Sequence, residues 1–145
     1  FEKTMYQTPP TRFEAGTGNV ADAVGLGAAI DYINTIGIEN INRYEQSLLE
    51  YGIEALRCVP GLRLIGEARA KAGVISFVMD GFTTEEIGNF LSKEGIAVRS
   101  GHHCAQPILR EFGLEATVRI SLAFYNTYEE LDRLVSVLSK LTKVY

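Results

Sequence analysis

Cysteine and histidine are scarce in this sequence, with two of each among 145 residues. Cys58 and Cys104 are too few for a disulfide scaffold, and no C-x-x-C or H-x-x-x-H spacing indicates a zinc site. His102, His103 and Cys104 are contiguous, and adjacent side chains rarely converge on one ion, so we predict no metal site. Two cysteines in this setting favour a reducing cytoplasmic location.

Basic residues and long apolar runs are also lacking. Lysine and arginine number 14 against 18 acidic residues, and the net charge of −4 without a basic stripe argues against a nucleic-acid partner. No apolar run approaches the roughly 18 residues of a membrane span, and no signal-peptide pattern is present, so we expect no membrane association. A hydrophobic fraction of 46% over 145 residues predicts one globular domain.

Reactive side chains are concentrated in one stretch, Arg99–Gln106, which contains two histidines and Cys104. The residues before it are apolar and β-prone and Pro107 begins a short helical pattern, so the stretch is predicted to connect a strand to a helix. A positive charge and a helix N-terminus both lower a thiol pKa, and the thiolate is the reactive form. Cys104 is therefore a candidate nucleophile, with a small buried cysteine as the alternative.

Arg119 lies among apolar residues of a predicted strand at 118–123. A buried arginine is costly unless it is paired, and its planar guanidinium suits bidentate binding of a carboxylate. The residue types thus predict either a ligand-binding arginine or a structural ion pair. His102 and His103 are candidates for loop packing or for proton transfer.

Hydrophobic periodicity and turn residues predict five helices and four strands. The helices are expected at residues 20–35, 39–58, about 84–93, 107–112 and about 127–142, and the strands at 62–66, 73–79, 96–99 and 118–123. Because these elements do not alternate strictly, we expect an α/β (α+β-like) sandwich with a short mixed or antiparallel sheet covered by helices. Cys58, in the last turn of the second helix, is interpreted as structural.

Residues 1–19 are interpreted as an extended arm and a Gly-rich loop, followed by a domain at 20–145. Gly16 and Thr17 lie before a helix start, where backbone N–H groups can bind phosphate. From spacing alone the favoured interpretation is an ordinary helix start with Asn19 as the N-cap, since the pattern is neither a P-loop nor G-x-G-x-x-G.

Three blocks of the sequence resemble one known family. Val98–Pro107 resembles the catalytic cysteine loop of the Suf-type cysteine desulfurases and selenocysteine lyases, which are PLP-dependent, fold-type I enzymes of the class V aminotransferase family. Arg12–Thr17 and Val118–Thr127 resemble the preceding and following blocks of that family. The resemblance implies that the chain is the small C-terminal domain of such an enzyme, and that the large PLP-binding domain is absent from it.

The resemblance also implies roles for individual residues. Cys104 corresponds to the nucleophile that takes sulfur from L-cysteine as a persulfide and leaves alanine, for Fe–S cluster assembly. Arg119 corresponds to the arginine that holds the substrate carboxylate, and Arg99 to a second active-site arginine. Gly16 and Thr17 correspond to residues that reach the phosphate of pyridoxal 5'-phosphate in the partner subunit of a homodimer.

Further expectations concern the rest of the enzyme. None of the five lysines follows a histidine, as the Schiff-base lysine of the family does, so the isolated chain is expected to be inactive and to expose an apolar face. A sulfur-acceptor protein is an expected partner. Two alternatives stay open: a selenocysteine lyase, and a stand-alone sulfur-relay module that carries persulfide on Cys104 without PLP.

Overall fold

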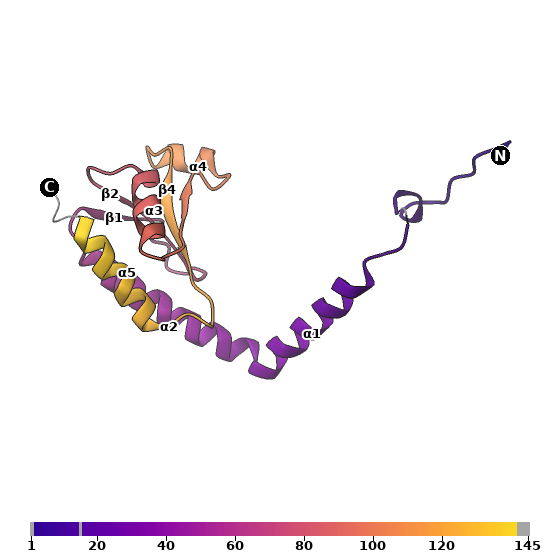
Figure 1. The fold of residues 1–145 in the computed structure, drawn as a ribbon, viewed down its shortest axis with the longest axis horizontal. Helices are drawn as coiled ribbons and strands as arrows, with labels where there is room; N and C mark the ends of the chain where they lie inside the picture. Colours follow the sequence, from indigo (N-terminus) through magenta and orange to yellow (C-terminus); the bar gives the residue numbers. More distant parts are fainter. Residues whose placement is uncertain (1, 15, 142–145) are drawn as a thin grey trace. The chain divides into compact units, whose positions relative to one another are not determined.

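The computed structural model describes residues 2–14 and 16–141 of the chain (Figure 1). Contacts within it divide the chain into two compact units, Phe1–Ile38 and Glu39–Tyr145, and each is described by itself. The predicted division into an arm up to residue 19 and a domain from residue 20 stays a prediction. Of the predicted elements, the last residue of the final helix, Thr142, lies outside the described residues.

The first unit contains a short 3-10 turn, η1 (Thr11–Phe13), and the helix α1 (Val20–Ile36). The Asn19 side chain accepts a hydrogen bond from the Asp22 backbone N–H at 3.1 Å, which confirms the predicted N-cap. Gly37, with φ at +89°, ends the helix. No described residue of α1 is buried, although many of its residues are large and apolar: Val20, Val24, Leu26, Ile30, Tyr32 and Ile33.

The second unit is built on one antiparallel sheet with the strand order β1-β2-β4-β3. Its strands are β1 (Leu62–Ile65), β2 (Val74–Met79), β3 (Arg99–Gly101) and β4 (Thr117–Ser121). The sheet confirms the predicted fold class, and its order leaves β1 and β3 at the two edges.

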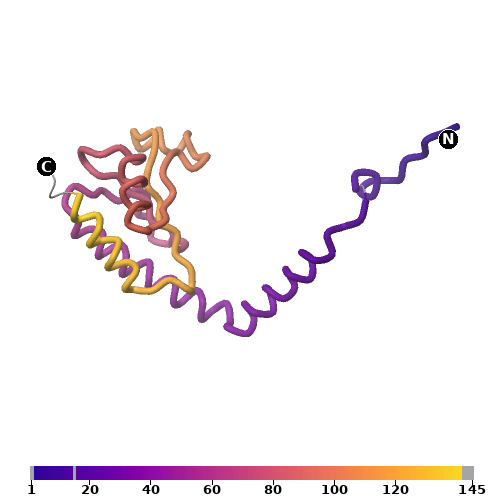
Figure 2. The backbone as a smooth tube through the Cα atoms, in the orientation of Figure 1, coloured from indigo at the N-terminus to yellow at the C-terminus, as the bar shows by residue number. Residues whose placement is uncertain are grey.

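Three helices cover one face of this sheet: α2 (Ile38–Arg57), α3 (Thr84–Lys93) and α5 (Tyr128–Leu141) (Figure 1). Figure 2 shows the backbone of α2 running beside that of α5, and the Tyr128 hydroxyl joins the two helices by donating to Ser47 Oγ at 2.9 Å. The core lies between these helices and the sheet and includes Leu49, Leu56, Ile75, Phe77, Ile87, Leu91, Val118, Ile120, Leu134 and Leu138. Within the described residues, no helix is long and apolar enough to cross a membrane.

The opposite face of the sheet carries the remaining side chains of the strands. Because side chains alternate along a strand, Ser76 points away from the buried Ile75, and Thr117 and Arg119 point away from the buried Val118. The short helix α4 (Gln106–Glu111) contributes to the same side, where its residues line a cavity together with these three. This face is therefore the polar face of the sheet.

The predicted strand at 96–99 is wrong in its position, because β3 begins only at Arg99. The backbone N–H of Ile96 donates to the Leu91 carbonyl at 2.9 Å, which ties the segment back to the end of α3 rather than to β4. Pairing with β4 therefore starts three residues later than the apolar pattern indicated.

The structural interpretation of Cys58 needs a correction, because this side chain is exposed. The buried positions at the end of α2 belong to Leu56 and Val59, which are 0% and 2% exposed. Cys58 turns outward between them, and its thiol lies 3.5 Å from the Glu54 carbonyl oxygen.

Candidate functional site

Two arginines lie directly opposite each other on neighbouring strands of the polar face. The sheet register pairs Arg99 of β3 with Arg119 of β4, Arg119 with Ser76 of β2, and Ser76 with Ile65 of β1. These four residues form one row across all four strands. Side chains that face each other in this way have Cβ atoms about 4.5–5.5 Å apart, so the two guanidinium groups share one region of the surface.

The two arginines have no acidic partner among the described residues. Like charges directly opposite each other destabilise a sheet. The Nε atom of Arg119 is buried and lacks a hydrogen-bond partner, whereas Arg99 is exposed. The ion-pair alternative for Arg119 thus finds no partner in the described chain. An incoming carboxylate would both relieve the repulsion and accept the free donors.

A cavity of about 250 Å³ lies beside this row. One wall comes from the strands and the loop after β3, and the other comes from α4 and the residue that ends it. The lining residues are Ile65, Ser76, His103, Ala105, Ile108, Leu109, Phe112, Thr117 and Arg119. A cavity with an apolar wall and a few polar groups opposite it suits a small molecule with a charged end.

Cys104 lies in the connection between β3 and α4, as the sequence predicted. Its side chain is exposed and forms no disulfide, which excludes the alternative of a buried cysteine. His103 and Cys104 have φ angles of +56° and +58°, so two consecutive residues with a Cβ adopt the left-handed conformation that favours glycine. Such a residue costs of order 1–3 kcal/mol and persists only where its surroundings enforce it.

The backbone of the Cys104 loop, residues 102–105, is held by two local hydrogen bonds. The Cys104 backbone N–H donates to His102 Nδ1 at 2.9 Å, and the Ala105 N–H donates to the His102 carbonyl, also at 2.9 Å. A ring nitrogen that accepts carries no proton, so the proton of neutral His102 lies on Nε2.

His103 connects the loop to the sheet. Its Nε2 lies 3.0 Å from the Thr117 carbonyl oxygen and 2.9 Å from Thr117 Oγ1. A carbonyl only accepts, so Nε2 carries the proton, and Nδ1 is an acceptor that is buried without a partner in the described chain. Burial lowers the pKa of His103, the bond to Thr117 opposes this change, and the charges of Arg119, Arg99 and His102 act with burial.

Thr117 was not predicted as a site residue from the sequence. It is 1% exposed and faces the same side of the sheet as Arg119, two residues along β4. The sequence did show a polar residue two positions before Arg119 on the same strand. Its role becomes apparent only from the structure, in which His103 contacts it.

Gly16 and Thr17 belong to the first unit, whereas the Cys104 loop belongs to the second. Gly16 has φ at +79°, and an added Cβ would meet no atom within 4 Å. Neither residue has a hydrogen-bond partner among the described residues. Their N–H groups and the Thr17 hydroxyl are donors that suit phosphate oxygens.

Comparison with known proteins gives consistent results. Residues 1–134 match the family model described as aminotransferase class-V. The chain is 63% identical over 141 residues to a cysteine desulfurase of Synechococcus elongatus, and 50% identical over 141 residues to that of Serratia proteamaculans. Each alignment covers 97% of this chain but only 22% and 34% of the two relatives, so the chain spans about a fifth to a third of their length.

Solved structures share the fold. The apo structure of a cysteine desulfurase from Thermococcus onnurineus matches 96% of this chain and 35% of its own, with a TM-score of 0.87 and 38% identity. The cysteine desulfurase CsdA of Escherichia coli, in an S-sulfonic acid form, matches 95% of this chain and 34% of its own, with a TM-score of 0.83 and 34% identity.

Proposed function

Because the chain belongs to the class-V aminotransferase family, we propose that it is the C-terminal part of a Suf-type cysteine desulfurase, the part that accepts the sulfur. The observation that carries this proposal is the position of Cys104. Its exposed side chain follows β3, and Arg99 of that strand lies opposite Arg119 without an acidic partner in the described chain. The similarity to cysteine desulfurases at 63% and 50% identity supports the same activity.

The residues present fit a pyridoxal 5'-phosphate cofactor that is held mainly by another part of the full-length protein. Gly16 and Thr17 would bind its phosphate through their free donors, from the partner subunit of a homodimer. The cofactor supplies an electron sink for the carbon skeleton of the substrate. None of the five lysines of the chain follows a histidine, so we expect the lysine that binds the cofactor to lie elsewhere in the protein.

Arg119 binds the carboxylate of L-cysteine in this proposal. Its guanidinium offers parallel N–H donors in a fixed plane, and the buried Nε still lacks an acceptor. Arg99, directly opposite, adds a second positive charge on the exposed side. Holding the carboxylate in this way fixes where the substrate sulfur lies relative to the Cys104 loop.

Cys104 acts as the nucleophile in its thiolate form. Its sulfur attacks the substrate sulfur, so an S–S bond forms while the bond between the substrate sulfur and its β-carbon breaks. The electron pair of the broken bond stays with that carbon, which takes up a proton and becomes the methyl group of alanine. The persulfide that stays on Cys104 is exposed, so a sulfur-acceptor protein can take it for Fe–S cluster assembly.

The test uses the full-length protein with its cofactor, and compares Cys104→Ala with Cys58→Ala. Cys58 is the matched control because it is the other exposed free cysteine and lies at the end of α2. Cys104→Ala should abolish both alanine release from L-cysteine and the labelling of protein persulfide, whereas Cys58→Ala should leave both unchanged. Retained cysteine desulfuration in Cys104→Ala would contradict the proposal. Activity retained only with L-selenocysteine in that variant would favour a selenocysteine lyase.

A further inference from the structure

We infer that His103 and Thr117 are positioning residues that hold the Cys104 loop in a single conformation and so determine where its thiol lies. The inference rests on the function proposed above, because it assigns a role toward the nucleophile of that reaction.

The loop needs an anchor because its backbone conformation is unfavourable. His103 and Cys104 both have positive φ angles, and cysteine is not among the residue types, such as glycine, asparagine and histidine, that adopt this conformation more readily. The exposed Cys104 side chain gains no buried packing that could hold this conformation. The two hydrogen bonds of His102 stay within the loop, so they shape the turn without fixing it to the rest of the molecule.

The contact between His103 and Thr117 supplies the anchor. Among the hydrogen bonds that residues 102–105 make in the described chain, this one alone reaches the sheet. Thr117 lies at the start of β4, opposite Gly101, the last residue before the loop leaves the sheet. Both oxygens of the buried Thr117 lie within 3.0 Å of the same ring nitrogen of His103, which is itself half-buried, so water competes less for this contact than at the open surface.

The charges around His103 favour the neutral ring that this contact requires. Burial of the ring and the positive charges of Arg119, on the same strand as Thr117, and of Arg99 on β3 disfavour an imidazolium. A neutral ring with its proton on Nε2 donates to the carbonyl. Without the donor, His103 and Cys104 would be free to return to the common backbone conformations, and the direction of the Cys104 side chain would change with them.

The experiment uses the full-length protein with its cofactor, and measures kcat and KM for L-cysteine. His103→Ala removes the anchor and should lower kcat about 10- to 100-fold, the loss expected when a reacting group is misplaced by about 1 Å. KM and the change in cofactor absorbance on adding L-cysteine should stay unaltered, because Arg119 still binds the carboxylate. His103→Gln, whose side-chain amide can donate to Thr117, should recover most of kcat.

Three results would overturn the inference: an unaltered kcat in His103→Ala, a loss of kcat and substrate binding together, or no recovery in His103→Gln. If His103→Ala fails to fold, His103→Phe replaces it, since it keeps an aromatic ring but has no N–H to donate to the Thr117 carbonyl. That variant should lower kcat at unaltered KM, and an unaltered kcat would again overturn the inference. Cys104→Ala reports separately on the proposed function: if it retains activity with L-cysteine, the function fails whatever the result at His103.

Discussion

At the scale of single residues, the polar face of the sheet is organised around positive charge that is not neutralised within the described chain. Arg99 and Arg119 face each other across β3 and β4, and neither has an acidic partner there. Such a pair is unfavourable in the free protein and becomes favourable when a carboxylate binds. The row therefore favours binding of an anionic substrate over a purely structural role.

Arg119→Lys should raise KM for L-cysteine about tenfold or more in the full-length protein, because a lysine retains the charge but loses the bidentate geometry. Steady-state alanine release measures the effect. Arg63→Lys is the matched control, because Arg63 is an exposed arginine of β1 in the same sheet and should leave KM unaltered. An unchanged KM in Arg119→Lys would show that the carboxylate binds elsewhere.

The stability of the chain should depend on pH through His103. Burial lowers the pKa of His103 in the folded chain below 6.5, so the unfolded chain binds the proton first as the pH falls. The contribution of His103 is complete above the unfolded pKa and is lost as the pH falls from there through the folded pKa. Urea unfolding of this chain should therefore give a lower free energy of unfolding at about pH 5 than at about pH 7.

His103→Gln should reduce this difference, because glutamine keeps the donor but binds no proton. Titration of Glu86 and Glu130 does not account for the difference between about pH 5 and about pH 7. Hydrogen bonds lower their pKa values below 4.5, so their contributions are lost only in more acidic solution. An equal decrease in the variant and the unaltered chain would rule out His103 as the source.

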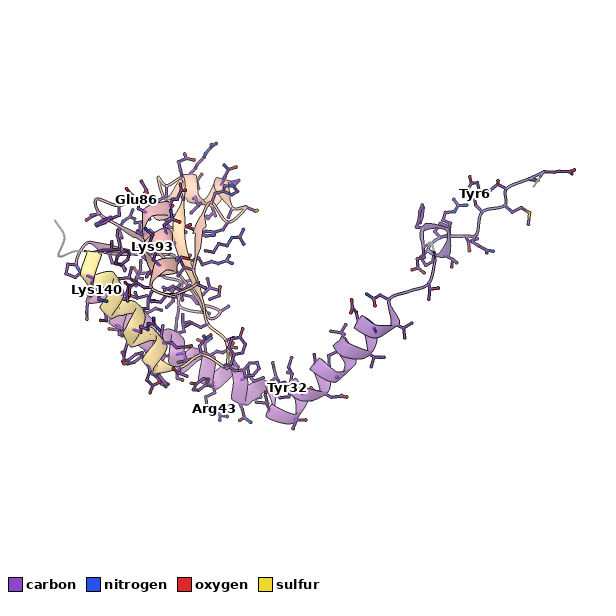
Figure 3. All side chains as sticks on the ribbon, viewed as in Figure 1. Tyr6, Tyr32, Arg43, Glu86, Lys93 and Lys140 are labelled. Atoms are coloured by element: carbon purple, nitrogen blue, oxygen red, sulfur yellow. The ribbon has the colours of Figure 1, made fainter. Side chains whose placement is uncertain are left out.

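At the scale of secondary structure, α3 supports the strand that leads into the Cys104 loop. The Thr83 hydroxyl accepts from the Glu86 N–H at 3.2 Å, and Glu86 Oε2 accepts from the Thr83 N–H at 2.8 Å (Figure 3 labels Glu86). This capping box begins a helix that approaches β3 closely: a Cβ at Gly88 would lie 2.9 Å from Ser100 Oγ.

Thr83→Ala should lower the free energy of unfolding of this chain by about 1 kcal/mol, since it removes the N-cap of α3. Urea unfolding at neutral pH measures the loss. Ser92→Ala, at an exposed position in the last turn of the same helix, is the control and should cause no decrease. An equal free energy of unfolding in Thr83→Ala and the unaltered chain would show that this N-cap does not contribute to stability.

Local signals predicted the elements well. The Asn19 cap and the start of α1 depend on neighbouring residues, and the structure confirms them, with the helix ending one residue later than predicted. The strand at 96–99 was misplaced because its position depends on pairing with β4 and on a bond back to α3, and neither is visible in the local pattern. Cys58 illustrates the same limit, since one residue at the end of a helix separates a buried from an exposed side chain.

The candidate site was predictable in part. The concentration of reactive residues in one stretch marked the Cys104 loop, and the resemblance supplied candidate roles for its members. No local pattern indicated that Arg99 and Arg119 face each other, because register is a property of two distant segments. Thr117 was missed for the same reason: its relation to His103 spans 14 residues and depends on the path of the loop.

At the scale of the whole chain, α1 carries more apolar surface than this chain covers. None of its described residues is buried, and Val24, Leu26 and Ile30 are each at least half exposed. A helix of this composition is normally buried in a complete protein.

The isolated chain should therefore self-associate through α1, and Leu26→Lys with Ile30→Lys should reduce the association. Sedimentation velocity over a range of concentrations measures it. Leu109 is left unchanged because it is buried in α4. The control is Lys140→Gln on α5 (Figure 3), an exposed position where the substitution should not alter the association. A chain that is monomeric at every concentration would contradict this expectation.

The strand order has a consequence for how sulfur can be transferred. Arg119 lies on β4, which is bonded to a strand on each side, whereas the Cys104 loop continues from β3, an edge strand of three residues with one bonded neighbour. The Cys104 loop therefore lies at the border of the sheet, where another molecule can approach it, while Arg119 lies inside the sheet. In the proposed reaction, the substrate carboxylate would be held on an interior strand of the sheet, while the persulfide would be carried on the loop after an edge strand, where a sulfur-acceptor protein can reach it.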